Sequence, residues 1–199
     1  ISIHIATKDR HSELALLLQS LRTQTYNNWD LIILDESQTP ISNSQFLTGL
    51  INRIKLENHY VIIIRNEQSL GVCNARNKLI KNDFFENPLI CRLDDDVILS
   101  IDYLEKLTKV IELNYDIASG VTPLLGYPEF ERQINKIDKI INKKEIDNEG
   151  NIIKHGDDCG FCYSEEKIFP AHEFRSNALM KREVIEKVKY ENNLSPVGF

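Results

Sequence analysis

The sequence predicts an α/β fold in which a mostly parallel central sheet is covered by helices on both faces. Strand-like and helix-like segments alternate along residues 1–121. The strand-like segments are continuous apolar runs, which is typical of parallel strands buried on both faces. Polar residues gather where these runs end, and such sheets bind ligands beyond the carboxyl ends of their strands. The pattern therefore predicts a binding site at one edge of the sheet.

The first three strands are expected at residues 1–6, 31–34 and 60–64, and the third is aromatic and β-branched throughout. Leucines at helical spacing follow the first strand, which predicts a helix there. A second helix follows residues 31–34, and its expected buried face holds Phe46, Leu47, Leu50, Ile51 and Ile54. These elements make up two strand–helix repeats and a third strand.

Gly71 precedes a third helix, and residues 89–93 form a fourth strand that leads directly into Asp94, Asp95 and Asp96. Ser100 is the predicted N-cap of the next helix, because a serine oxygen accepts a hydrogen bond from a free amide of the first turn. A fifth strand is expected at 117–121, and a last strand and helix at 174–180 and 182–189. Between them, residues 122–170 read as an insertion that acts as a lid or acceptor loop, with a short helix near 134–143.

Composition limits the partners and the location of the protein. A chain of 199 residues with 42% hydrophobic and 27% charged residues suits one globular domain. The net charge of −6 disfavours nucleic acid as a partner. No signal peptide or membrane-spanning run is visible. The cytoplasm is therefore the expected location, with an upstream segment outside this chain, or peripheral association at the inner face of the membrane, as open alternatives.

The four cysteines divide into two pairs. Cys73 and Cys91 stand singly among apolar residues and are expected in the core. Cys159 and Cys162 form a C-x-x-C motif that supplies half of a zinc site. We favour two loop thiols over a zinc site completed by His155 and His172.

Three successive aspartates at a strand end, Asp94 to Asp96, repel one another unless a cation neutralises them. Mg²⁺ or Mn²⁺ suits such oxygen ligands and commonly bridges carboxylates to phosphate. The alternative is a solvated acidic turn before a helix, where negative charge is also favourable. The buried strand before the aspartates favours the cation site.

Four segments match one known pattern in order and at the expected intervals. They are IHIATKDR at 3–10, SLRTQTY at 20–26 with WDLIILDE at 29–36, GVCNARN at 71–77, and LDDD at 93–96 followed by IDYL at 101–104. Through these segments the chain resembles glycosyltransferase family 2, the inverting enzymes of the Rossmann-like GT-A fold, along essentially its whole length.

The resemblance implies a single GT-A domain over residues 1–199. Residues 1–121 would be the nucleotide-sugar-binding half, and 122–199 an incomplete acceptor-side portion. The implied reaction is metal-dependent transfer of a sugar, with inversion, from a nucleoside-diphosphate sugar to an acceptor hydroxyl. Mn²⁺ or Mg²⁺ would be the cofactor, a UDP-sugar the donor, and a glycan, lipid or protein the acceptor, as in polysaccharide biosynthesis.

The resemblance also implies roles for individual residues. Thr7 and Asp9 would line the nucleoside pocket, and Asp35 and Glu36 would accept hydrogen bonds from the base or the ribose. Arg76 would approach the ribose or the diphosphate. Asp94 and Asp95 would touch the ribose and the sugar, and Asp96 would bind the metal. Turn formation for the Asp35–Glu36 pair, and an exposed helix charge for Arg76, stay open as alternatives. Arg175, Ser176 and Asn177 would form the acceptor-facing floor, or simply belong to an edge strand.

The sequence departs from the family pattern in three places, of which one is Val97, where the family often has a third acidic residue. The usual DDGS reads Asp35-Glu36-Ser37-Gln38, and the longer glutamate alters the pocket. The family's catalytic base lies in an acidic motif after the last helix, so we expect a truncated domain whose base lies beyond Phe199. The positions of Asp157, Asp158 and Glu173 do not match that motif.

Two other classes of protein stay open. A sugar nucleotidyltransferase would carry a glycine-rich phosphate loop near the first strand, and residues 7–18 contain no glycine. A non-catalytic module that binds nucleotide-sugar or polysaccharide agrees with the missing base. Comparing this chain with a longer one in a sugar-release assay separates enzyme from module.

Overall fold

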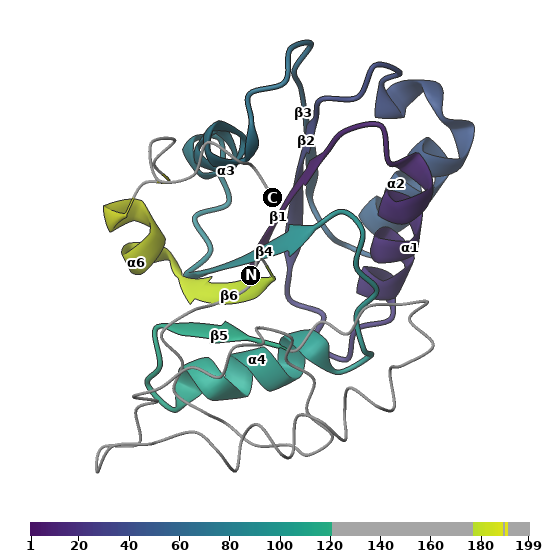
Figure 1. Cartoon of the computed structure of the whole chain (residues 1–199). Coiled ribbons are helices and arrows are strands. Elements are labelled where there is room, and N and C mark those ends of the chain that lie inside the picture. The colour runs from purple at the N-terminus through teal and green to yellow at the C-terminus, as the bar shows by residue number, and fades with distance from the viewer. Residues whose placement is uncertain (121–176, 189, 191–199) are drawn as a thin grey trace, which may run out of the picture. The chain divides into compact units, whose positions relative to one another are not determined.

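The computed structural model describes residues 1–120, 177–188 and 190, drawn in colour in Figure 1. The predicted helix near 134–143, the Cys159–Cys162 pair, Arg175 and Ser176 lie outside these residues. Within the described ranges, no helix has the length and apolar character needed to cross a membrane. Contacts divide the chain into two compact units, Ser119–Arg175 and the remainder, and the site described below belongs to the remainder.

A six-stranded sheet with the order β3-β2-β1-β4-β6-β5 organises the fold. Its strands are β1 (Ser2–Thr7), β2 (Asp30–Asp35), β3 (Val61–Arg65), β4 (Leu89–Asp94), β5 (Ile117–Ser119) and β6 (Ala178–Lys181). The first four pair in parallel, and β6 runs antiparallel to β4. The predicted mostly parallel sheet is confirmed. The antiparallel strand was not anticipated, and no sequence pattern distinguishes it.

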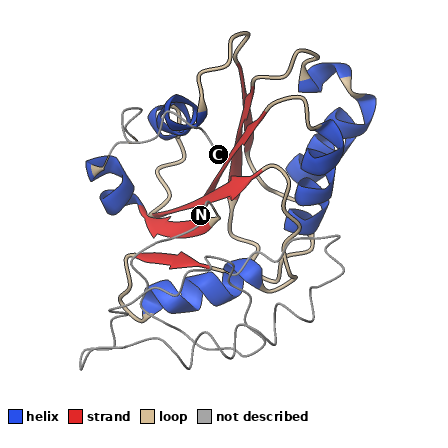
Figure 2. Ribbon diagram, in the orientation of Figure 1, coloured by secondary structure: helices blue, strands red, loops and turns tan. Residues whose placement is uncertain are grey.

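Helices lie on both sides of the strands, as Figure 2 shows. They are α1 (His11–Arg22), α2 (Gln45–Leu56), α3 (Val72–Lys81), α4 (Tyr103–Glu112) and α6 (Arg182–Lys187), with a short 3₁₀ helix η1 (Ile41–Asn43). Alternate residues of each strand face opposite sides. In β1, Ile3 and Ile5 therefore join the core under α1, α2 and α4, whereas His4 faces the side of α3 and α6.

Three sequence predictions about these elements were wrong. Phe46 is 71% exposed, because it lies about 100° around α2 from Leu47 and about 140° from Ile51, at the margin of the buried stripe. Ser100 does not cap α4, whose N-cap is Asp102, because an extra turn bonds Tyr103 N to Ser100 O. The third strand runs over Val61–Arg65 at one side of the sheet and none of its residues is fully buried, although Val61 packs against one core cluster and Ile62 and Ile64 against another.

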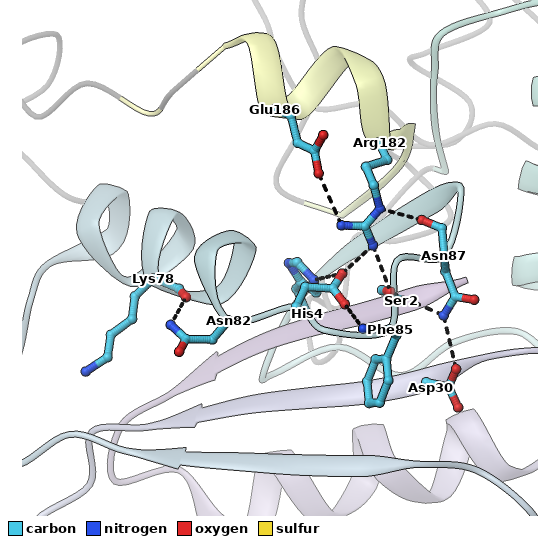
Figure 3. A network of polar contacts seen from close by, with 10 residues as sticks. Ser2, His4, Asp30, Lys78, Asn82, Phe85, Asn87, Arg182 and Glu186 are labelled. Carbon is cyan, nitrogen blue, oxygen red and sulfur yellow. Dashed lines mark hydrogen bonds and ion pairs between the residues drawn. The ribbon is translucent and has the colours of Figure 1, made fainter.

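A buried polar network fastens β1 to α6, as Figure 3 shows. The Asp83 carboxylate accepts hydrogen bonds from His4 Nε2 at 3.0 Å and from Arg182 Nη2 at 2.6 Å. Arg182 also donates to Ser2 Oγ and to the carbonyl oxygen of Asn87. Burial alone raises the pKa of Asp83, but these hydrogen bonds outweigh it and hold that pKa below its usual range. The network therefore keeps Asp83 ionised on the α3 and α6 side of the sheet.

Candidate active site

The carboxyl ends of β1, β2 and β4 meet at one edge of the sheet. The parallel register places Thr7 beside Asp35 and Ala6 beside Asp94. Glu36 N also donates to Thr7 O at 2.9 Å, which extends the β1–β2 pairing by one residue. The polar side chains that end three separate strands are thus brought together, as the strand pattern predicted.

Asp95 is held from two sides by residues that follow β1. Thr7 Oγ1 donates to Asp95 Oδ2 at 2.8 Å, and Arg10 Nη1 donates to Asp95 Oδ1 at 3.2 Å. The side chain is almost fully buried, and burial raises its pKa despite the hydrogen bond from Thr7 and the charge of Arg10. Both oxygens of Asp95 are therefore engaged in joining the β1 loop to the β4 loop.

Asp96 is the more accessible carboxylate of the acidic turn. Its side chain is 47% exposed, and its Oδ2 accepts a hydrogen bond of 2.7 Å from the same Arg10 nitrogen that contacts Asp95. Asp95, followed by Asp96, raises the pKa of the Arg10 guanidinium. One arginine thus neutralises part of the charge of two adjacent aspartates.

Asp94 connects the acidic turn to α3 and β6. Its backbone N donates to Asn177 Oδ1 at 2.8 Å, and its Oδ1 lies 3.7 Å from Arg76 Nη2. Burial, followed by the charge of Arg92, lowers the pKa of Arg76. The guanidinium groups of Arg76 and Arg92 each lie 5.5 Å from the centre of the Tyr190 ring. Arg76 is thus a partly buried cation directed towards Asp94, with Tyr190 against it.

Asp35 and Glu36 brace the loops beside the predicted nucleoside pocket. Asp35 is buried and accepts hydrogen bonds from the backbone N of Ser37 at 3.0 Å and of Ile41 at 2.8 Å. Glu36 accepts hydrogen bonds from Asn66 Nδ2, Ser69 Oγ and Leu70 N. A carboxylate has about four acceptor positions. Contact with a nucleotide would therefore use the lone pairs that these bonds leave.

Asp9 shapes the loop between β1 and α1. Its φ angle of 57° lies in the left-handed region, which non-glycine residues seldom adopt. Its Oδ1 accepts a hydrogen bond of 2.6 Å from Gln38 N, and its own N donates to Ser37 Oγ at 3.0 Å. Asp9 therefore ties the β1 loop to the β2 loop at the edge where Asp35 lies.

The carboxylates of the acidic turn fit a divalent cation in one coordination mode. Among residues 1–120, 177–188 and 190, no three His, Cys, Asp or Glu side chains converge on a common point. Mg²⁺ typically binds through one or two carboxylates and completes its coordination with waters and phosphate oxygens. The half-exposed Asp96 fits that mode, whereas Asp95 has both oxygens engaged. The cation would therefore depend on a phosphate ligand.

Two side chains at this edge received no role from the sequence. Arg10 could have been assigned to the site from the sequence, because it follows the first predicted strand by a few residues and three carboxylates were expected at the same edge of the sheet. Tyr190 could not have been assigned in this way, since no spacing or pattern in the sequence relates it to Arg76. Of the predicted acceptor-side residues only Asn177 is described, and it is buried, with Oδ1 bound to Asp94 N.

Comparison with known proteins identifies related sequences. A family model described as Glycosyl transferase family 2 matches residues 2–188. A Haemophilus influenzae protein named "Uncharacterized glycosyltransferase" is 31% identical over 123 residues, which cover 59% of this chain and 36% of that protein. The Dictyostelium discoideum protein "Bifunctional glycosyltransferase pgtA" is 26% identical over 132 residues, covering 66% of this chain and 16% of that one. The matched region thus spans only about a third or less of these relatives.

Solved structures share the fold at low sequence identity. Staphylococcus aureus TarS 1-349 in complex with UDP-GlcNAc matches with a TM-score of 0.52 and 17% identity, over 63% of this chain and 35% of that one. The mannosyltransferase PcManGT from Pyrobaculum calidifontis, in complex with GDP-Man and Mn²⁺, matches with a TM-score of 0.56 and 10% identity, over 94% and 45% of the two chains. The expected GT-A fold is therefore confirmed.

Proposed function

The chain belongs to glycosyl transferase family 2, and on this premise we propose that it transfers a sugar from a UDP-sugar to an acceptor hydroxyl, with inversion and with Mn²⁺ or Mg²⁺ as cofactor. The choice of UDP is supported by the UDP-GlcNAc complex of TarS, and the choice of cation by the Mn²⁺ complex of PcManGT. A glycan, lipid or protein remains the proposed class of acceptor.

The observation that carries the proposal is that arginine and aspartate side chains lie together at the ends of β1 and β4. Thr7 and Arg10 fix Asp95, and this contact holds the turn so that the neighbouring Asp96 stays half exposed. Arg76 lies at the other end of the same turn, beside Asp94. A diphosphate placed between Asp96 and Arg76 would find a cation-binding carboxylate at one end and a guanidinium at the other.

In the proposed reaction these residues bind and orient the donor. Thr7, Asp9, Asp35 and Glu36 would border the nucleoside, Asp94 and Asp95 the ribose and sugar, and Arg76 the diphosphate. A bound divalent cation supplies the charge that stabilises the departing nucleoside diphosphate. The carboxylates described at this edge are each engaged by cations or by hydrogen-bond donors. We therefore assign the general base for the acceptor to none of them.

Isothermal titration calorimetry with UDP tests the proposal. We expect wild-type protein to bind UDP in Mn²⁺ and to lose at least tenfold in affinity in EDTA. Asp96→Asn should remove most of that cation dependence. The matched control is Asp116→Asn, because Asp116 is 65% exposed and forms a 2.8 Å ion pair with Lys181. If Asp96→Asn behaves like Asp116→Asn, the assignment of Asp96 fails.

A further inference from the structure

Arg10 occupies an unusual place in the acidic turn. A single nitrogen, Nη1, lies 3.2 Å from Asp95 Oδ1 and 2.7 Å from Asp96 Oδ2, so one donor bridges two neighbouring carboxylates. The arginine side chain is 51% exposed. Arg10 and Asp96 are therefore both open to solvent, so that an incoming cation can reach the carboxylate that Arg10 already contacts.

The backbone of Arg10 is fixed, whereas its side chain is free to change partner. Arg10 is the N-cap of α1, and its carbonyl oxygen accepts a hydrogen bond from Leu14 N at 2.9 Å. The preceding Asp9 holds the loop through its bonds with Gln38 and Ser37. A half-exposed arginine on a fixed backbone can move its charged end between nearby anions without moving the loop.

We propose that Arg10 is the resident counter-ion of the acidic turn, competes with the divalent cation for Asp96, and thereby makes cation binding depend on the nucleotide. The inference rests on the proposed function, because it takes Asp96 as the cation ligand. The proposed reaction above gives Arg10 no role; here it acts as a counter-ion that leaves Asp96 when cation and diphosphate bind.

The physical reason is charge balance. A divalent cation on Asp96 lies close to a guanidinium of the same sign, and like charges at that distance repel. A diphosphate reverses the balance, because it adds ligands for the cation and offers phosphate oxygens to the released guanidinium. Cation and nucleotide should therefore each raise the affinity of the other by the same factor.

Electron paramagnetic resonance of free Mn²⁺ measures this coupling directly on the full chain. Wild-type protein should bind Mn²⁺ at least tenfold more tightly with saturating UDP than without it, which corresponds to about 1.4 kcal/mol of coupling. Arg10→Gln should bind Mn²⁺ without UDP at least tenfold more tightly than wild type, and its UDP-dependent gain should shrink. Arg10→Lys keeps the charge and should stay near wild type.

The control is Arg53→Gln, which removes the same charge from an arginine that is 61% exposed and paired with Glu57 on α2. If Arg10→Gln matches Arg53→Gln in Mn²⁺ affinity without UDP, the inference is overturned. If wild-type protein binds UDP equally well with and without cation, the proposed function fails, and the coupling fails with it because the two effects are reciprocal. If wild-type protein shows the coupling but Arg10→Gln matches Arg53→Gln, only the role of Arg10 fails. Tighter Mn²⁺ binding by Arg10→Gln without UDP, together with an undiminished UDP-dependent gain, would overturn the claim that Arg10 makes cation binding depend on the nucleotide. Circular dichroism checks that each variant is folded.

Discussion

Replacing Asp83 by asparagine tests whether the buried network between β1 and α6 holds the fold together. The Asp83 side chain is fully buried, and its carboxylate accepts hydrogen bonds from His4 and Arg182. Asp83→Asn keeps the size of the side chain but removes its charge. Arg182, whose side chain is mostly buried, then loses its principal counter-ion.

The expected cost is about 3 kcal/mol of unfolding free energy, because breaking a buried ion pair by removing one partner costs about 3–5 kcal/mol and asparagine retains one acceptor. That is a large share of the total stability of an ordinary domain, about 5–15 kcal/mol. The lowered pKa of Asp83 adds a pH dependence. The stability that ionised Asp83 contributes is complete above about pH 3.9, the pKa of an aspartate in the unfolded chain, and is lost as pH falls below that value.

Urea denaturation followed by circular dichroism measures the loss. Asp116→Asn is the matched control, since Asp116 pairs with Lys181 at 2.8 Å but is 65% exposed, and an exposed pair contributes only about 0.2–1 kcal/mol. The reasoning predicts a several-fold difference between two substitutions of the same chemistry. Equal losses in the two variants would refute the claim that burial, and not the ion pair itself, sets the cost.

Two further predictions concern arginine contacts elsewhere in the fold. Hydrogen bonds from Arg22 lower the pKa of Glu57 to about 2. Glu57→Gln should therefore cost about 1 kcal/mol of unfolding free energy after allowance for solvent screening. That cost should vanish as pH falls from about 4.5 towards 2, which urea denaturation across that range measures. A cost that is constant with pH would exclude the ion pair as its cause. Tyr190→Ala should weaken UDP binding several-fold in calorimetry, because it removes ring contacts worth about 0.5–1 kcal/mol for each of Arg76 and Arg92. Tyr190→Phe keeps the ring and should lose less UDP affinity. Equal losses of affinity in the two variants would contradict a role for stacking.

The sequence predicted what depends on local pattern. Continuous apolar runs identified β1, β2 and β4, and a polar residue at each strand end located the edge where Thr7, Asp35 and Asp94 meet. Local pattern failed at Phe46, which lies at the margin of the buried stripe of α2, and at Ser100, where an added turn displaces the N-cap of α4 to Asp102.

Contacts between distant residues were beyond the sequence. His4 was interpreted only as part of a buried strand, and its partner Asp83 lies 79 residues away. Arg10 was placed correctly in the loop after the first strand, but its choice of Asp95 and Asp96 depends on how the β1 and β4 loops pack. A propensity or a spacing carries no information about which of several carboxylates an arginine selects. These contacts require the fold.

The central claim is that Asp96 binds a divalent cation which also ligates the diphosphate of the donor. The most direct measurement is an anomalous difference map from crystals that contain Mn²⁺ and UDP. The account predicts a Mn²⁺ peak within bonding distance of an Asp96 oxygen and of the UDP phosphates, with the Arg10 guanidinium moved off Asp96. UDP bound away from the β1 and β4 loops, or a Mn²⁺ peak without an Asp96 ligand, would contradict it.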